Sequence, residues 1–450
     1  MTPLARIARL SAAFLGSNLA RAAIGFGLSF ALARGVGAER FGRWILCTAW
    51  ASTLTSFVDL GFGVLLTRDG ARPEAEAGHL LTGALVARLA LALPLAAMLF
   101  VCAGYISMDA ETIAGLRVAA LLGTAGATYG CFGALFRSQA RWLPTALAGE
   151  TVWLAIQLGA AWWIVTVWSS ASGGIVGAGG AGGAGGSDQT IAWLMTLAVV
   201  VQLAQILTAV VCWRAVFGSR GRMRWPTRDA LATLLRRALP FAAAGIVANL
   251  QTRVGPLMLG YLSSQAEIGL FAAASRFGTV ARLAPQAVFA GALPVLSHEH
   301  GRNRQSAERV FRTFDRILLA AACAAAAGCA LFATPLLRLV YGTPFTQAAP
   351  ALLWIGVGLI PLLTNAGRKV FLYASGGEGT VVRWSAAALF IQVCAGAALI
   401  PSLGSAGAAV SIAIAEALVW WPLRRASPRQ VTTVTAIDTE LAEPAGAFVK

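Results

Sequence analysis

The sequence predicts an all-α polytopic membrane protein, with twelve transmembrane helices in two six-helix bundles around a central cavity. Three observations support this fold class. Of the 450 residues, 58% are hydrophobic and only 12% are charged, and the mean hydropathy is +0.71, far above the values of soluble globular proteins. Apolar runs of helical length recur along the whole chain. The basic residues cluster between these runs.

Each run of about 20 apolar residues predicts one helix, because a helix of that length crosses the hydrocarbon core of a bilayer. The first half holds six such runs, near 11–33, 43–66, 80–104, 113–136, 146–169 and 190–213. The second half holds six more, near 238–262, 267–292, 315–342, 346–366, 381–401 and 403–423.

A strongly basic stretch separates the two sets of helices. It reads RAVFGSRGRMRWPTRDALATLLRR, contains seven arginines and indicates a cytoplasmic linker. The predicted organisation is an N-terminal bundle (1–213), the linker (214–237), a C-terminal bundle (238–424) and a cytoplasmic, disordered tail (425–450).

The distribution of Arg and Lys between alternate loops predicts the orientation. With the N-terminus inside, the inner segments hold twenty-five of these residues and the outer loops hold four, which are Arg34, Arg40, Arg43 and Arg338. Both termini are therefore expected in the cytoplasm. The membrane expected for such a chain is the bacterial cytoplasmic (inner) membrane.

The two halves share a short pattern. LARGVGAERFGRW (32–44) follows the first span of the first half, and LGYLSSQAEIGLF (259–271) follows the first span of the second. Each closes a helix, turns through a short polar loop and restarts at a glycine, Gly42 or Gly269, beside an aromatic residue. Internal repeats of this kind are typical of transporters that bind substrate between two bundles.

The charge and cysteine patterns exclude other classes. The net charge of +16 is spread over membrane loops without an aromatic-basic reading motif, so no nucleic-acid partner is predicted. The seven cysteines show no CxxC or Cys/His spacing, so neither a metal site nor a cofactor is expected.

The segment ALARGVGAERFGRWILCTAWASTLTSFVDLGFGVLLTR (31–68) resembles the start of polysaccharide flippases of the MOP exporter superfamily, the O-antigen and exopolysaccharide (Wzx-type) transporters. The family's recurring positions are filled here by Gly37, Phe41, Gly42, Asp59, Leu60, Gly61 and Arg68. A second segment (239–277) is similar to the family's seventh and eighth helices. The chain departs from many relatives at Val254-Gly255-Pro256, where they carry an acidic residue beside the position of Arg253.

The resemblance implies a flippase, not an enzyme. Its expected substrate is an undecaprenyl-phosphate- or pyrophosphate-linked oligosaccharide, moved from the inner to the outer leaflet of the bilayer for lipopolysaccharide or exopolysaccharide synthesis. A polysaccharide polymerase or export machinery is a candidate partner.

Arginines within the spans are the candidate substrate ligands. An arginine at the centre of a membrane helix normally faces a bundle interior or water. Arg21 follows Asn18 by three residues and Arg253 follows Asn249 by four, so each helix presents an amide and a guanidinium on one face. With Arg276, these residues are predicted to bind the anionic headgroup, because guanidinium groups match phosphate oxygens bidentately.

Other ionisable residues in the spans have two interpretations. Arg88 and Arg117 lie nearer span ends, where they are expected to snorkel. Asp59, Glu150 and Glu416 are candidates for coupling transport to a proton or sodium ion. The alternative is that these carboxylates pair with Arg21, Arg253 or Arg276 as buried structural ion pairs.

Two other functions remain as alternatives. A polytopic O-antigen polymerase or ligase would have a similar number of spans, but the longest outer loop here is glycine-rich and contains no Arg or His. Another MOP exporter is the second alternative. A multidrug exporter would favour an acidic cavity, and the lipid II flippase typically has two additional helices.

Overall fold

The computed structural model describes residues 3–70, 76–138, 151–160, 162–163, 166, 190–218, 222–223, 225–281, 304–374 and 377–425. Every regular element among these residues is helical, as expected in lipid, where a segment must satisfy its backbone hydrogen bonds internally. The helices are α1 (Pro3–Asp59), α2 (Phe62–Gly70), α3 (Ala77–Ile106), α4 (Ala110–Ser138), α6 (Thr190–Phe217), α7 (Arg228–Leu262), α8 (Gln265–Ala281), α10 (Arg304–Tyr341), the 3₁₀ helix η2 (Thr343–Ala348), α11 (Ala349–Ala374) and α12 (Glu378–Arg425). A further helix covers Thr151–Ala160.

Two of the helices kink at a glycine. α1 bends at Gly37 (φ 79°) and α12 bends at Gly404 (φ 53°). Glycine adopts this left-handed region without the steric cost that a Cβ would add. The turn predicted between the first two spans is therefore present, but it is a kink at Gly37 and not a longer polar loop. We call residues 3–36 and 38–59 the first and second arms of α1.

Seven of the described helices are long and apolar enough to cross a membrane. Two of them, 18–59 and 379–425, include the kinks of α1 and α12 and provide two crossings each. α7, α8 and the shorter helix Thr151–Ala160 lie within the other three predicted spans, so every predicted span has a described helix in it. Parts of the predicted spans 146–169 and 267–292 lie outside the described residues.

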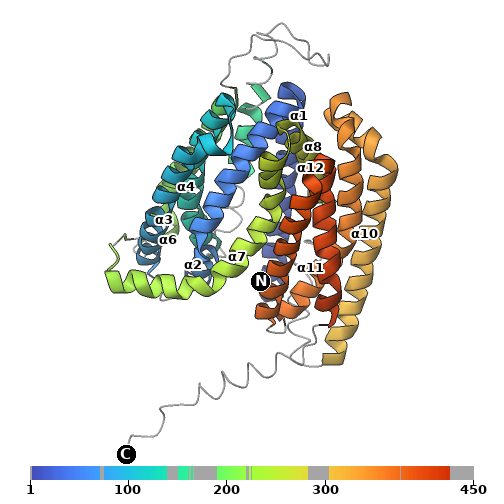
Figure 1. Ribbon diagram of the computed structural model, residues 1–450. Helices are drawn as coiled ribbons and strands as arrows, with labels where there is room; N and C mark the ends of the chain where they lie inside the picture. Colours follow the sequence, from blue (N-terminus) through green and yellow to red (C-terminus); the bar gives the residue numbers. More distant parts are fainter. Residues whose placement is uncertain are drawn as a thin grey trace, which may run out of the picture.

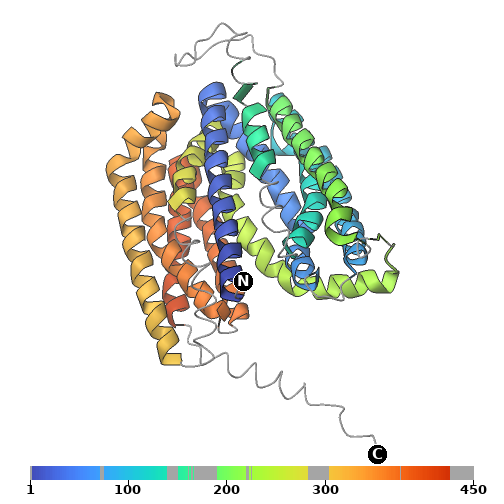
Figure 2. The same cartoon turned by 180° about the vertical axis from the view of Figure 1, so that it is seen from behind.

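The crossings form two bundles (Figures 1 and 2). α1 to α4 and α6 build the first, and α8, α10, α11 and α12 build the second. α7 begins along the lower edge of the first bundle in Figure 1 and then rises to pack against α12 and α1. The bundles lie close together in the upper part of both views and diverge toward the lower part.

The two bundles meet at the end of the molecule where α1 and α12 bend. Gly42 of α1 contacts Gly269 of α8 across the boundary between the bundles. Within the second bundle, Ser405 N at the α12 kink donates a 2.6 Å hydrogen bond to Glu267 Oε2 of α8. We call this the kink end. It lies at the top of Figure 1.

The opposite end is held by ion pairs. Arg237 of α7 lies 2.6 Å from Asp69 of α2, and Arg424 of α12 lies 2.8 Å from Asp315 of α10. We call this the linker end, because α6 ends and α7 begins there (Figure 1).

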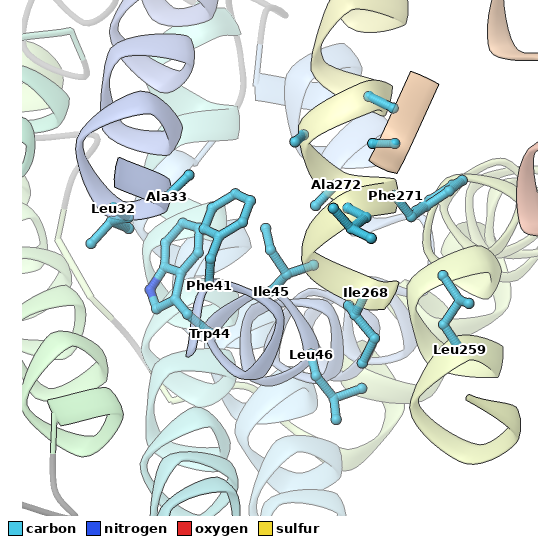
Figure 3. Close-up of a cluster of buried hydrophobic side chains, with 14 of the residues drawn as sticks. Leu32, Ala33, Phe41, Trp44, Ile45, Leu46, Leu259, Ile268, Phe271 and Ala272 are labelled. Atoms are coloured by element: carbon cyan, nitrogen blue, oxygen red, sulfur yellow. The ribbon is translucent and has the colours of Figure 1, made fainter. Parts of the chain in front are cut away.

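The largest buried apolar cluster lies between α1 and α8 (Figure 3). Phe41 and Leu46 of α1 pack near Ile268 and Phe271 of α8, and all four are buried. α8 adds consecutive alanines at 272–274, which are also buried. Small residues let membrane helices approach closely, and dispersion contacts replace the hydrophobic drive that lipid does not supply.

The second predicted span, 43–66, is wrong at its C-terminal end. α1 ends at Asp59, and Leu60 (φ 42°) and Gly61 (φ 77°) both turn left-handed before α2 begins at Phe62. A Leu in this region is strained, and a tertiary contact must hold it there.

The predicted linker is partly helical. α6 continues to Phe217, and α7 begins at Arg228 after a cap in which Thr227 Oγ1 accepts a hydrogen bond from Ala230 N at 3.3 Å. A threonine cap satisfies a backbone donor that the first helical turn leaves free. The boundary at 237–238 therefore falls within α7.

Candidate functional site

A polar cavity of about 510 Å³ lies in the first bundle. Its walls come from α1, α4, α6 and Thr151–Ala160, and α7 contributes Asn249. Its polar lining residues are Arg21, Thr48, Ser52, Thr55, Ser56, Tyr129, Arg137, Gln157, Gln202, Gln205 and Asn249. Hydroxyl, amide and guanidinium groups suit a substrate rich in hydroxyl and anionic groups.

The second arm of α1 lines the polar cavity with hydroxyl groups. Thr48, Ser52, Thr55 and Ser56 share one face, because residues three and four apart on a helix are neighbours. Ser52 Oγ donates to Thr48 O at 2.7 Å, and Ser56 Oγ donates to Ser52 O at 2.8 Å. Thr48 and Thr55 donate to carbonyls in the same way. Sequence analysis missed this face, although its helical spacing of hydroxyl residues was a usable signal.

Arginine dominates the charge of the polar cavity. Arg21 of α1 and Arg137 of α4 line it, and its described lining residues include no Asp or Glu. Arg21 is exposed and Arg137 is partly exposed, as expected for groups that face a cavity. Sequence analysis assigned Arg137 only to an inner loop. The cavity therefore favours anions.

Arg253 and Arg276 lie together at the boundary between the bundles. Their charges are close enough to interact. Arg276 Nη1 lies 3.9 Å from the point where a Cβ on Gly25 would sit, and Gly25 is one turn from Arg21 on α1. Arg253 is one turn from Asn249, which lines the polar cavity. We call Arg253 and Arg276 the interface arginines.

Pairing with carboxylates is not seen for the interface arginines. Within the described part of the chain, no Asp or Glu lies within ion-pair distance of Arg253 or Arg276. Among the amides predicted beside the arginines, Asn249 Nδ2 donates to Gly245 O at 2.9 Å and its side chain is exposed. Asn18 is half-buried on α1 and is not among the lining residues of the polar cavity.

Arg88 is buried rather than snorkelling, which corrects the sequence-based expectation. It is 2% exposed and forms an ion pair with Asp59. Its Nη1 also donates to Ala127 O at 3.0 Å, and its guanidinium carbon lies 5.7 Å from the Phe62 ring centroid. The charge is compensated, so it does not need to reach the membrane surface.

The Arg88–Asp59 pair lies directly behind the polar cavity. Gly130 lines the cavity, and a Cβ on Gly130 would come within 2.8 Å of Arg88 Nη1. The Asp59 side chain is 40% exposed. The predicted alternative of a carboxylate paired with an in-span arginine thus applies to Asp59, but its partner is Arg88.

The other two candidate carboxylates lie elsewhere. Glu416 of α12 is buried in the second bundle, where Asn365 Nδ2 donates to its Oε2 at 2.7 Å and to its backbone O at 2.8 Å. Glu150 lies outside the described residues. Arg117, predicted to snorkel, is exposed and lies 5.2 Å from the Phe100 ring centroid.

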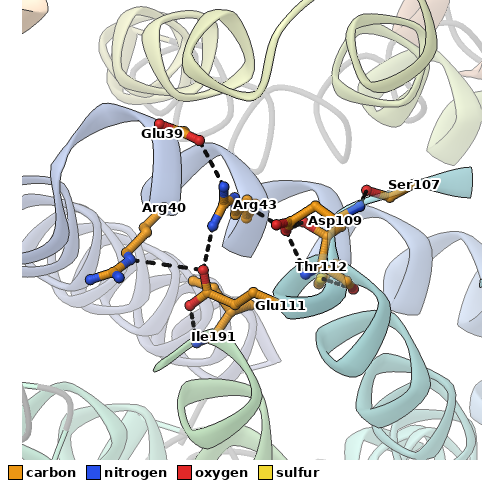
Figure 4. A network of polar contacts seen from close by, with 9 residues as sticks. Glu39, Arg40, Arg43, Ser107, Asp109, Glu111, Thr112 and Ile191 are labelled. Carbon is orange, nitrogen blue, oxygen red and sulfur yellow. Dashed lines mark hydrogen bonds and ion pairs between the residues drawn. The ribbon is translucent and has the colours of Figure 1, made fainter. Parts of the chain in front are cut away.

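Carboxylates neutralise two of the four outer-loop arginines at the kink end (Figure 4). Arg43 pairs with Glu111 and lies 2.7 Å from Glu39, while Arg40 lies 3.8 Å from Glu111. Glu111 Oε1 also accepts a 3.1 Å hydrogen bond from Ile191 N at the start of α6. The kink end therefore carries less net positive charge than its arginine count suggests.

The structure thus combines two helical bundles with a polar cavity that two arginines line. Solved structures share this fold, at identities that establish the fold alone. An inward-facing multidrug resistance MATE family transporter of the MOP superfamily matches with a TM-score of 0.71 and 13% identity, over 92% of this chain and 96% of its own. The lipid II flippase MurJ in an inward closed conformation matches with a TM-score of 0.67 and 14% identity, over 92% and 86%. An outward-facing MATE family transporter of the MOP superfamily matches with a TM-score of 0.60 and 14% identity, over 95% of this chain and 96% of its own.

Two family comparisons identify the chain more narrowly. A sequence model described as "Polysaccharide biosynthesis protein" matches residues 8–299, and one described as "Lipid II flippase MurJ" matches residues 173–448. The chain belongs to the polysaccharide biosynthesis protein family, and more than half of it also matches the lipid II flippase model. No curated protein sequence matches it. The matched families and structures are transporters and flippases, which agrees with the prediction that the protein is not an enzyme.

Proposed function

We propose that the protein translocates an undecaprenyl-phosphate- or pyrophosphate-linked oligosaccharide from the inner to the outer leaflet of the bacterial cytoplasmic membrane, for polysaccharide export. The observation that carries this proposal is the polar cavity, in which Arg21 and Arg137 lie among hydroxyl and amide side chains. An anionic, hydroxyl-rich headgroup suits this lining, whereas a cationic drug does not.

The interface arginines extend the basic surface toward the second bundle. Arg21, Arg253 and Arg276 hold the phosphate oxygens, and the fork of each guanidinium can bind two of them. Asn18, Asn249 and the hydroxyl face of α1 contact the sugars. The lipid chain remains in the bilayer, so only the polar headgroup is desolvated from water.

The linker end is the cytoplasmic side in this proposal. Arg68 of α2 and Arg424 of α12 lie there, and basic residues are retained on the cytoplasmic side of a membrane. The first bundle corresponds to residues 1–213 and the second to 238–424, with the basic segment 214–237 between them.

The described conformation supports substrate loading from the cytoplasmic side. The bundles converge at the kink end and diverge toward the linker end (Figures 1 and 2). The TM-score is also higher against the inward-facing MATE transporter (0.71) than against the outward-facing one (0.60). A headgroup would enter the polar cavity from below and leave after the bundles reverse their tilt.

Substitution of Arg21 and Arg276 tests the binding role. We expect Arg21→Ala and Arg276→Ala to abolish surface polysaccharide while the membrane level of the protein is maintained. Lysine should restore export only partly, since it keeps the charge but loses the bidentate fork. Arg117→Ala is the matched control, because this exposed arginine of α4 lies outside the polar cavity. Normal polysaccharide in both alanine variants would exclude the proposed role.

The lipid II flippase is the second candidate function. The match of the MurJ model to residues 173–448 favours it. The two substrates share a polyprenyl pyrophosphate, so the arginines alone do not separate them. Expression in a strain depleted of its own lipid II flippase distinguishes the two functions. Restored growth would favour lipid II, and restored polysaccharide export in an export-deficient strain would favour the first proposal.

Asp59, Glu416 and Glu150 remain the candidates for ion coupling. Asp59 is the most exposed of the two that the structure describes, and it touches Arg88 behind the polar cavity. A proton at Asp59 would weaken its ion pair with Arg88. Because Arg88 lies against Gly130 of the cavity wall, such a change at Asp59 would be felt at the polar cavity.

A further inference from the structure

A second cavity lies at the linker end of the second bundle, apart from the polar cavity. Its volume is about 610 Å³, and α12 alone supplies its described lining. The lining residues are Thr380, Arg383, Trp384, Ala387, Trp421, Pro422 and Arg425. The kink at Gly404 folds α12 back on itself, so the start and the end of one helix become neighbours. We call this the α12 cavity.

Two arginines without carboxylate partners face the α12 cavity. Arg383 Nη2 donates to Thr380 Oγ1 at 3.5 Å, and Arg425 lies over the Trp421 ring at 4.1 Å from its centroid. In the described residues, neither forms an ion pair with Asp or Glu. The adjacent Arg424 contrasts with them, because it pairs with Asp315 at 2.8 Å. Two exposed cations at one cavity give it a positive charge that attracts an anion.

Aromatic side chains show what kind of anion fits. Trp384 and Trp421 line the same cavity, and Trp421 is 57% exposed. Tryptophan concentrates where hydrocarbon meets the polar headgroups, since its ring is apolar and its N–H is polar. An occupant that offers an anionic group to the arginines and an apolar part to the tryptophan rings is amphiphilic. A free anion would contact the arginines but not the apolar faces of the tryptophans and Ala387.

We propose that the α12 cavity binds the headgroup of an anionic phospholipid from the leaflet at the linker end. The phosphate lies between Arg383 and Arg425, Thr380 contacts the polar head, and an acyl chain runs along Trp384, Ala387 and Trp421. Basic pockets between membrane helices on the cytoplasmic side are suited to such headgroups. The site shares no residue with the polar cavity and does not depend on the transported substrate.

The test is lipid binding to the purified full-length protein, measured by native mass spectrometry without polyprenyl lipids. Phosphatidylglycerol should remain bound at lower lipid concentration than phosphatidylcholine. Arg383→Gln with Arg425→Gln should weaken phosphatidylglycerol binding by about tenfold or more, because two charge-assisted contacts are lost. The double lysine variant should lie between this variant and the natural protein, since it keeps charge without the fork.

Two controls make the result specific. Arg316→Gln removes an exposed arginine of α10 outside the α12 cavity and should leave phosphatidylglycerol binding unchanged. Brominated phosphatidylglycerol in nanodiscs should quench less fluorescence after Trp421→Phe with Trp384→Phe than it does in the natural protein. Equal affinity for the two lipids, an unaffected double glutamine variant, an equal loss in Arg316→Gln, or complete displacement of the lipid by inorganic phosphate would each overturn the proposal.

Discussion

Gly42 of α1 and Gly269 of α8 pack against each other in a reciprocal way. A Cβ on Gly42 would lie 1.8 Å from Gln265 O, and a Cβ on Gly269 would lie 2.1 Å from Ala38 O. Gln265 precedes Gly269 by four residues, and Ala38 precedes Gly42 by four. Each glycine therefore makes room for the carbonyl one turn before the other. These two glycines also occupy equivalent places in the short sequence repeat. The two copies of the repeat therefore contact each other where the bundles meet.

The reciprocal contact predicts that a single methyl group at either glycine separates the bundles. We expect Gly42→Ala and Gly269→Ala each to lower the unfolding free energy by about 1–3 kcal/mol. The added methyl group would clash with a backbone carbonyl of the facing helix, which cannot rotate away as a side chain can. Thermal unfolding in detergent measures the change. Gly104→Ala and Gly328→Ala are controls, because no atom lies within 4 Å of a Cβ at either position. Unchanged unfolding in both contact variants would contradict this packing.

The proposed orientation predicts which cysteines an impermeant reagent reaches. In a variant whose seven cysteines are replaced by alanine, Met223→Cys and Trp225→Cys place thiols at exposed linker positions. They should resist labelling in intact cells and react after the membrane is opened. Met108→Cys, 99% exposed between α3 and α4, should react in intact cells. The reverse pattern would invert the topology.

The Arg88–Asp59 pair predicts an asymmetry between its two single variants. Asp59→Asn leaves the buried Arg88 guanidinium without its counter-ion and should destabilise the protein by about 3–5 kcal/mol. Arg88→Met should cost less, because the remaining Asp59 carboxylate is 40% exposed and can be hydrated. Chemical unfolding of both variants in one detergent compares them. A larger loss for Arg88→Met would show that the pair does not act in this way.

Charge in the polar cavity predicts that membrane potential drives transport. An anionic headgroup that leaves a negative interior gains about 2.3 kcal/mol per charge per 100 mV. The empty basic cavity returns inward in the same field. Flipping in proteoliposomes, with the potential set by potassium and valinomycin at equal pH and without sodium, should fall when the potential is collapsed. Unchanged transport would refute potential drive, and dependence on a pH or sodium gradient would point to Asp59 and Glu416.

The fold was predictable because membrane helices are specified by long apolar runs, which are independent of tertiary detail. The number and order of the crossings followed from those runs. The sharpness of the turn at Gly37 did not, since its neighbouring polar residues resemble a loop and only the left-handed backbone shows that one glycine separates the two helical arms. The end of α1 at Asp59 was hidden for a similar reason, because Leu60 and Gly61 continue the apolar run.

The candidate site was predictable in its arginines and less so in its surroundings. An arginine within an apolar run attracts attention by its desolvation cost, and Arg21 does line the polar cavity. The partner of a buried charge depends on which helices pack together, so the assignment of Asp59 to Arg88 required the structure. Serine and threonine are common in membrane helices. The structure was needed to show that the shared face of these four residues lines the cavity.

The hydroxyl face of α1 has a chemical consequence for selectivity. Thr48, Ser52, Thr55 and Ser56 each give their only hydrogen to a backbone carbonyl. What they offer to the cavity is therefore oxygen lone pairs, which accept hydrogen bonds but do not donate them. Every sugar ring carries hydroxyl donors in several orientations, so these oxygens can accept hydrogen bonds from different glycans with about equal strength. Discrimination between epimers, which needs fixed donors as well as acceptors, has to come from other residues or from the enzymes that assemble the glycan.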